Sequence, residues 1–327
     1  MSTMMYRDAL RAALLEEMRR DPRVFVIGEE VGRYGGAYAV TKGLFEEFGA
    51  ERLVDAPISE ASTVGLGVGA AITGLRPVVE LMYVDFIGLA ADQIANQMAK
   101  VRYMTGGQVT VPMVLRTQGG TGRSAGAQHS QSLEAWLAHV PGLRVVMPST
   151  PADAKGLLKT AIRSDDPVVF IEHKALYAMK GEVPGGELLV PFGQAAVVRN
   201  GNDLTMITYS RMVHYALEAA QKLAADGISA EVIDLRTLNP LDMDTVLASV
   251  RRTRRALVLN EAHRTAGFCS ELAARVTEEL FDVLEAPVSR VAAKDVPVPA
   301  TLLEKLSIPG PDDVAAEARA LVQRRRR

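Results

Sequence analysis

The chain has 327 residues, of which 48% are hydrophobic and 23% are charged, a composition typical of a globular protein with room for two domains and a core in each. The formal net charge of −2 excludes the positive charge that would attract the chain to nucleic acid or to an anionic membrane surface. The single cysteine, Cys269, excludes an internal disulfide framework and is typical of a reducing compartment, so we expect a cytoplasmic protein without a signal peptide.

The amino-terminal half predicts helices and strands in alternation. Residues 6–20 carry apolar side chains at helical spacing, and Asp21-Pro22 stops this helix. Further helices are predicted at 60–74, 85–104, 131–139 and 151–163, and strands at 23–28, 77–81, 111–116, 143–147 and 167–171. Apolar strands that alternate with helices are typical of a parallel sheet covered on both faces.

The predicted helix at 60–74 is unusually rich in glycine. Ser59 is suited to cap it, and Glu60 stands in its first turn, where a carboxylate stabilises the helix dipole. Each glycine costs up to about 1 kcal/mol relative to alanine, so we expect close packing against another backbone, in this chain or in another. The segment GLGVGA (65–70) matches a dinucleotide fingerprint, but it stands well past the helix start, and we do not expect nicotinamide binding.

A long glycine-rich loop, Gln118–Gln131, follows a predicted strand and carries His129. A loop in that position is suited to cover a ligand. Met82 and Phe86 stand just past the end of another predicted strand, where parallel sheets bind ligands. Taken alone, Glu60 is more often a dipole partner and His129 an ordinary polar contact. Their expected position on one side of the sheet makes a proton-transfer role for His129 an equal alternative.

The carboxyl-terminal half predicts a second α/β unit. Turn signals without a clear period over 174–193 indicate a break, and we expect domains at 1–185 and 201–327 joined by a linker at 186–200. Strands are predicted at 203–208, 229–234, 255–259 and 287–291, and helices at 211–225, 242–252, 268–281 and 311–323. The sequence therefore predicts two three-layer α/β/α domains with mostly parallel sheets. The arginine run Arg324–Arg327 is expected to be a solvated end.

Several segments resemble the β subunit of the E1 component of 2-oxo acid dehydrogenase complexes. They are PISE (57–60), GLRPVVE (74–80), AQHSQSLEAWLAHVPGLRVVMPSTPADAKGLL (127–158), PVVFIEHKALY (167–177) and EVIDLRTLNPLD (231–242). The likeness runs from near residue 4 to near residue 320 and implies a thiamine diphosphate pyrimidine-binding domain followed by a transketolase carboxyl-terminal-like domain. The implied activity is decarboxylation of a 2-oxo acid, with pyruvate favoured, and reductive acylation of the lipoyl group of E2.

The resemblance also implies roles for single residues. Glu60 matches the glutamate that hydrogen-bonds N1′ of the cofactor's aminopyrimidine, which favours the imino tautomer that can remove the C2 proton. Phe86 matches the aromatic residue that stacks on the pyrimidine, and Met82 matches a residue of the same pocket. His129 matches a histidine near the reacting end of the cofactor, implicated in acyl transfer to the lipoyl group.

Two metal sites follow from the same resemblance. The chain lacks the G-D-G motif and the later asparagine pair that hold Mg²⁺ and the diphosphate in such enzymes. This implies that an E1 α subunit supplies that half of the site, in an α2β2 heterotetramer.

The resemblance also implies a structural potassium site, in which Ser164 replaces a common acidic ligand. The residues that match this site are Met113, Ala161, Ile162, Ser164 and Asp166.

The sequence leaves the substrate open. The stretch EHKALYAMKGEVP (172–184) resembles pyruvate and acetoin types about equally, and a branched-chain 2-oxo acid dehydrogenase is a further alternative. A non-catalytic scaffold of the same fold, docked onto E2, is an alternative of another class. The presence of Glu60, Phe86 and His129 together favours the enzyme.

Overall fold

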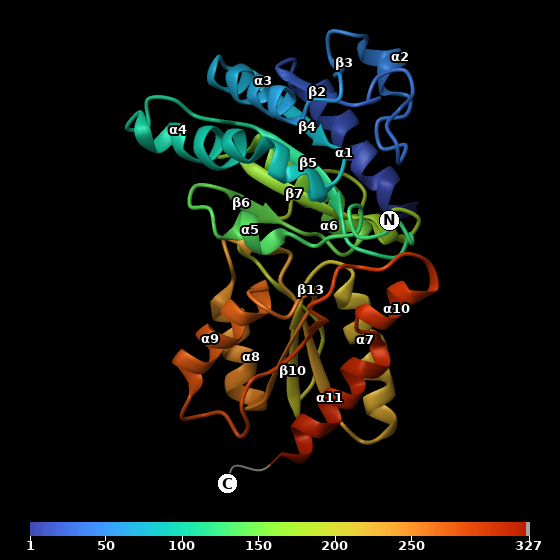
Figure 1. Ribbon diagram of the computed structural model, residues 1–327, viewed down its shortest axis with the longest axis vertical. Coiled ribbons are helices and arrows are strands. Elements are labelled where there is room, and N and C mark those ends of the chain that lie inside the picture. The colour runs from blue at the N-terminus through green and yellow to red at the C-terminus, as the bar shows by residue number, and fades with distance from the viewer. Residues whose placement is uncertain (325–327) are drawn as a thin grey trace. The chain divides into compact units, whose positions relative to one another are not determined.

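The computed structural model describes residues 1–324 and divides the chain into two compact units (Figure 1). Unit 1 comprises Met1–Gly119 and Trp136–Phe192, and unit 2 comprises Gly120–Ala135 and the chain from Gly193 onward. Residues 325–327, where most of the predicted solvated end falls, lie outside the described residues. None of the helices among residues 1–324 combines the length and the apolar character of a transmembrane span.

Unit 1 is built around a parallel sheet, in which its strands run in the order β6-β7-β5-β4-β2-β3. Its elements are β1 (Ser2–Met5), α1 (Tyr6–Arg20), β2 (Val24–Gly28), α2 (Leu44–Phe48), β3 (Leu53–Asp55), α3 (Glu60–Ile72), β4 (Arg76–Leu81), η1 (Val84–Ala90), η2 (Gln93–Met98), α4 (Ala99–Met104), β5 (Val114–Gly119), β6 (Arg144–Val146), α6 (Pro151–Arg163), β7 (Val168–His173), η3 (Lys174–Leu176) and β8 (Lys180–Val183). The short helix α5 (Glu134–Ala138) begins in unit 2 and ends in unit 1.

Helices cover both faces of the unit 1 sheet, as predicted. Val78 of β4 lies in a core cluster with side chains of α1 and α6, whereas the next residue, Val79, packs against Gly67 of α3. Successive strand side chains point to opposite faces, so β4 is buried on both. The predicted bounds of the helices at 6–20 and 151–163 are confirmed.

Unit 2 is a second open sheet with strand order β14-β13-β10-β11-β9, in which only the β9–β11 pair is antiparallel within the described residues. Helices α7 and α11 lie on one side of the strands and α8 and α9 on the other (Figure 1). Its elements are β9 (Ala196–Arg199), β10 (Leu204–Thr208), α7 (Met212–Ala225), β11 (Ala230–Asp234), β12 (Thr237–Asn239), α8 (Met243–Thr253), β13 (Ala256–His263), α9 (Phe268–Leu280), β14 (Ser289–Ala293), η4 (Thr301–Leu303), α10 (Glu304–Ser307) and α11 (Pro311–Gln323).

The predicted single helix at 85–104 is wrong. The structure has a 3₁₀ helix, η1, then a π-helical turn, η2, and only then the regular helix α4. Its buried apolar side chains stand first three and then four residues apart, at Ile87, Ala90, Ile94 and Met98. A 3₁₀ helix aligns residues three apart, so the helix type follows the spacing that burial requires.

Two short strands fall where the sequence predicted turns or linker. β8 pairs antiparallel with β1, in the register Ser2 to Val183, and β9 pairs antiparallel with β11 inside the range 186–200. Each is only four residues long and largely exposed, and each is defined by pairing with a strand elsewhere in the chain more than by its own sequence pattern.

Candidate active site

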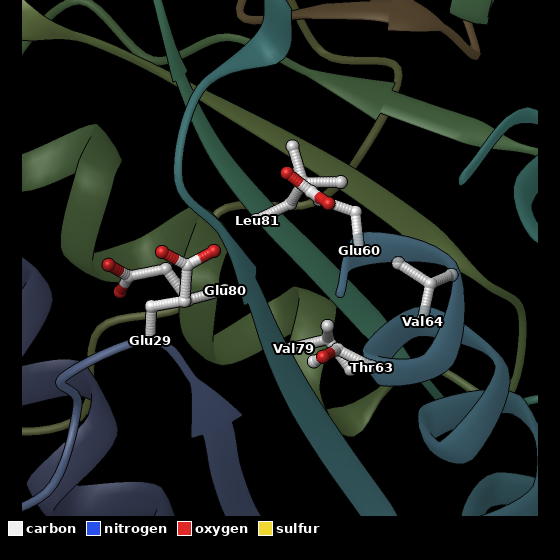
Figure 2. A pocket seen from close by; sticks show the side chains of 7 residues that line it. All are labelled: Glu29, Glu60, Thr63, Val64, Val79, Glu80 and Leu81. Carbon is white, nitrogen blue, oxygen red and sulfur yellow. The ribbon is translucent and has the colours of Figure 1, made fainter. Parts of the chain in front are cut away.

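Glu60 is the first residue of α3, and its side chain lines a small pocket beside β4 (Figure 2). β2 and β4 are neighbouring parallel strands, so residues at their carboxyl ends reach the same edge of the sheet. The pocket is lined by Glu29, Glu60, Thr63, Val64, Val79, Glu80 and Leu81. Three of these side chains are carboxylates and three are apolar, so the pocket can accept hydrogen bonds from a ligand and cover an apolar part of it.

Ser59 occupies the N-cap position of α3, but the predicted cap hydrogen bond is absent from the described structure. Its hydroxyl instead donates to Oγ of Ser62, at 2.8 Å. Thr63 fastens the first turn by donating its backbone N–H (2.9 Å) and its hydroxyl (3.0 Å) to the Ser59 carbonyl oxygen. The start of α3 is therefore held by the backbone of Ser59 and not by its side chain.

Three carboxylates meet at this pocket. Glu29 follows β2 directly, Glu60 starts α3 and Glu80 lies within β4. Burial raises the pKa of Glu29, and the nearby charges of Glu60 and Glu80 raise it further. Among residues 1–324 the Glu60 carboxylate makes no hydrogen bond or ion pair, so its oxygens are available to a ligand.

A buried arginine, Arg116, pairs with one of these carboxylates and with a further buried acid. Arg116 Nη1 is 2.7 Å from Glu80 Oε2, and the same guanidinium donates through Nε and Nη2 to Glu172 at 2.6 and 2.8 Å. Tyr177 donates its hydroxyl to Glu172 at 2.6 Å. Burial raises the pKa of Glu172, and Arg116 and Tyr177 oppose that rise. One arginine thus balances two buried acids and leaves negative charge near Glu29.

Phe86 lies on η1 within an aromatic cluster of unit 1. Its ring packs edge-on against Tyr83, with centroids 5.8 Å apart. The hydroxyl of Tyr38 donates to that of Tyr83 at 3.2 Å, and Lys174 Nζ stands 5.0 Å from the Tyr83 ring centre. Phe86 and Met82 are half-buried, so each keeps accessible surface. Unit 1 therefore contains Glu60, Met82 and Phe86, whereas His129 belongs to unit 2.

The residues predicted to bind potassium lie together in unit 1. Arg76 Nη1 donates to the carbonyl oxygens of Ile162 (3.0 Å) and Ser164 (2.9 Å), and the Asp166 carboxylate pairs with Arg102 and Arg144. A carbonyl oxygen has two lone pairs, so these oxygens can still accept an ion. Among the described residues, no group of three or more His, Cys, Asp or Glu could hold a metal ion.

The sequence prediction missed Glu29 and Glu80 as members of the site. The signal for Glu80 was an acid inside the apolar strand RPVVEL (76–81), because a buried charge needs a partner. The signal for Glu29 was its position directly after a strand, which points to the ligand-binding edge of the sheet only once β2 is known to lie beside β4.

Both halves of the chain match known domain families. Residues 2–180 match the transketolase pyrimidine-binding domain, and residues 193–314 match the transketolase C-terminal domain. Among solved structures, a chain described as a split-gene transketolase, inactive β4 tetramer, has a TM-score of 0.80 at 24% identity and covers 99% of each chain. That likeness shows the fold.

Curated relatives are much more similar in sequence. The chain is 51% identical to a mitochondrial pyruvate dehydrogenase E1 component subunit β-1 of Arabidopsis thaliana, over 95% of this chain and 87% of that protein. It is 46% identical to a 2-oxoisovalerate dehydrogenase subunit β of Bacillus subtilis, over 99% and 100%. It is 48% identical to an acetoin:2,6-dichlorophenolindophenol oxidoreductase subunit β of Cupriavidus necator, over 95% of each.

Proposed function

The chain belongs to the family of transketolase-like E1 β subunits of 2-oxo acid dehydrogenase complexes, and from that premise we propose that it works with an E1 α subunit to decarboxylate a 2-oxo acid and acylate the lipoyl group of E2. The observation that carries this proposal is Glu60, whose carboxylate faces a pocket at the end of β4 without a partner among residues 1–324. A scaffold has no need of an acid kept in that state.

Thiamine diphosphate is the cofactor that we propose for the site, and when bound it supplies the carbanion chemistry that amino-acid side chains cannot. Glu60 would accept a hydrogen bond from a protonated ring nitrogen of the aminopyrimidine and so select its tautomer. Val64, Val79 and Leu81 would shield the ring from water. Phe86, on η1, and Met82, which precedes η1, would cover the ring. His129 would transfer a proton at the reacting end.

The remaining parts of the assembly are proposals on the same basis. An α subunit in an α2β2 heterotetramer would hold most of the Mg²⁺ and diphosphate, because this chain has no G-D-G motif. The exposed side of α3, where Leu66 and Ile72 are 53% and 40% exposed and a Cβ at Gly69 would meet no atom within 4 Å, fits a subunit interface. We also propose a structural potassium ion at Met113, Ala161, Ile162, Ser164 and Asp166, and a cytoplasmic location.

The substrate is proposed to be pyruvate. The chain is slightly more identical to the Arabidopsis pyruvate relative, at 51%, than to the acetoin and 2-oxoisovalerate relatives, at 48% and 46%. Steady-state kcat/KM for pyruvate, acetoin and 3-methyl-2-oxobutanoate, measured with the reconstituted αβ complex, checks this. A higher kcat/KM for acetoin or the branched-chain acid would replace the pyruvate proposal.

Replacement of Glu60 by glutamine tests the function. An amide oxygen is neutral and much less basic than a carboxylate, so it cannot stabilise the protonated ring nitrogen to the same degree, and E60Q should lower kcat of the αβ complex by about 10²–10⁴-fold while the complex still assembles. Thr63→Ser, which alters the same pocket but keeps the hydroxyl bond to the Ser59 carbonyl, is the control. Full activity of E60Q would remove Glu60 from the mechanism, and a cofactor-loaded wild-type complex that never consumes a 2-oxo acid would favour the scaffold.

A further inference from the structure

The loop that carries His129 is closed at its base within unit 2. The backbone N–H of Gly120 donates to the carbonyl oxygen of Gln131 at 2.9 Å, so the two ends of the loop are joined two residues after His129. The first half of the loop has positive φ at four positions, Gly120, Gly122, Ser124 and Gly126. Ser124, at φ 54°, is the costly member, because this conformation costs a residue with a side chain about 1–2 kcal/mol.

Glu304 holds this strained half. It starts α10, is 7% exposed, and accepts two hydrogen bonds from loop backbone: Gly122 N–H at 2.7 Å to Oε1 and Ser124 N–H at 3.0 Å to Oε2. One carboxylate thus binds two N–H groups that are two residues apart. These bonds fix the positive φ at Gly122 and Ser124 and offset the cost at the serine.

Glu261 holds the preceding residue. It lies in β13, is 7% exposed, and its Oε1 accepts both the backbone N–H and the hydroxyl of Thr121, each at 2.6 Å. Arg211 donates to the Thr121 hydroxyl at 3.2 Å and stands 3.8 Å from Glu261 Oε2. Glu134, the last residue but one of the unit 2 segment that carries the loop, accepts a hydrogen bond from the hydroxyl of Tyr209 at 2.7 Å.

The cost of burying Glu304 argues for a purpose beyond packing. A buried carboxylate is destabilising unless its lone pairs are satisfied, and this one has loop N–H groups, and no cation, as its partners in the described part of the chain. An apolar side chain would fill the same place at lower cost. A loop that only had to be shielded from water would not need one carboxylate to bind the N–H groups of both Gly122 and Ser124.

We propose that Glu304 and Glu261 are positioning residues that hold residues 121–124 to unit 2 and thereby fix where the loop presents His129. The proposal rests on the proposed function for the role of His129, while the hold on the loop is a separate, measurable property. The backbone N–H of His129 donates to the carbonyl oxygen of Gly126 at 3.3 Å, so the backbone that follows Ser124 is bonded directly to His129.

Limited trypsin digestion of the full-length chain tests the hold. Arg123 is exposed between the two N–H groups that Glu304 binds, so cleavage after it reports release of the loop. Loss of one charge-assisted hydrogen bond makes E304Q cleave about tenfold faster at this bond. Glu231→Gln is the matched control, because Glu231 is 1% exposed, lies in unit 2 and bonds Ser249, Arg252 and Gly201 instead. An unchanged cleavage rate for E304Q overturns the proposal.

A double-mutant cycle on the αβ complex tests the link to His129. E304Q should lower kcat for lipoyl acylation about tenfold in the wild-type background and by nothing further in the His129→Ala background, which separates positioning from general destabilisation. A further tenfold loss on H129A overturns the proposal. If the wild-type complex has no 2-oxo acid turnover, the proposed function fails. The rate of cleavage after Arg123 then tests by itself whether Glu304 holds the loop.

A second variant serves if E304Q does not fold. Thr121→Val removes one hydrogen bond to Glu261, and trypsin should cleave it after Arg123 about threefold faster than wild type.

Discussion

The carboxylates at the Glu60 pocket of unit 1 and the carboxylates that hold the loop in unit 2 have different surroundings. Glu29, Glu60 and Glu80 share one pocket, and the charges of the last two raise the pKa of Glu29. Glu261 and Glu304 are each given backbone N–H donors of their own. The first group leaves the oxygens of Glu60 open to a ligand, whereas carboxylates that accept backbone N–H groups fix the backbone. The same side chain therefore serves chemistry or geometry according to its donors.

The largest expected effect comes from removing the arginine beneath the first group. Arg116→Met leaves Glu80 and Glu172 buried without their cation and should lower the free energy of unfolding by about 3–5 kcal/mol. Urea unfolding at pH 7 measures it. The same substitution at Arg19, whose partner Glu47 is itself exposed, is the control and should cost much less. Equal losses would contradict a special cost of leaving Glu80 and Glu172 without their cation.

A smaller effect is expected from moving the helix that carries Glu60. In Gly67→Ala the new Cβ would lie 2.5 Å from Val79 Cγ2, so α3 must shift, at a cost of about 1–3 kcal/mol. Thermal unfolding of the isolated chain measures the loss. Gly69→Ala is the matched control, because nothing lies within 4 Å of that position and alanine favours the helix. Destabilisation by both substitutions alike would contradict close packing at Gly67.

The pocket acids should also give a pH-dependent effect of known sign. The pKa of Glu29 is raised in the folded chain, mainly by burial, so the ionised side chain disfavours folding. The contribution of Glu29 to stability is therefore fully present below its unfolded pKa and is lost as the pH rises through its folded pKa. Glu29→Gln should therefore be more stable than wild type at pH 7 and equal to it near pH 4. Urea unfolding at both pH values checks this, and a variant less stable at pH 7 would contradict it.

The smallest effect concerns potassium. Arg76 already donates to the carbonyl oxygens of Ile162 and Ser164, so an ion there would share them, and we expect KCl to raise the thermal midpoint by only about 2 °C over choline chloride at equal ionic strength. NaCl is the control for ion size. Identical midpoints in all three salts would contradict the potassium site.

Much of the fold could be predicted because it follows from local pattern. The helices at 6–20, 151–163 and 311–323 have their predicted bounds, since each shows an apolar stripe and a sharp stop or start. The region 85–104 could not, because its 3₁₀ and π turns depend on which side chains the sheet buries. β8 and β9 could not either, since each is defined by a partner far away in the chain.

The same division holds for the site. The sequence by itself placed Glu60 at a helix start and Phe86 after a strand, because helix starts and strand ends are set by neighbouring residues. Only the tertiary structure decided that Glu29 and Glu80 join Glu60, and that Thr121 and Gly122 are bound by acids 140 and 182 residues later in the chain. Hydrogen bonds across such separations leave no periodic pattern, since either partner alone is one polar residue among many.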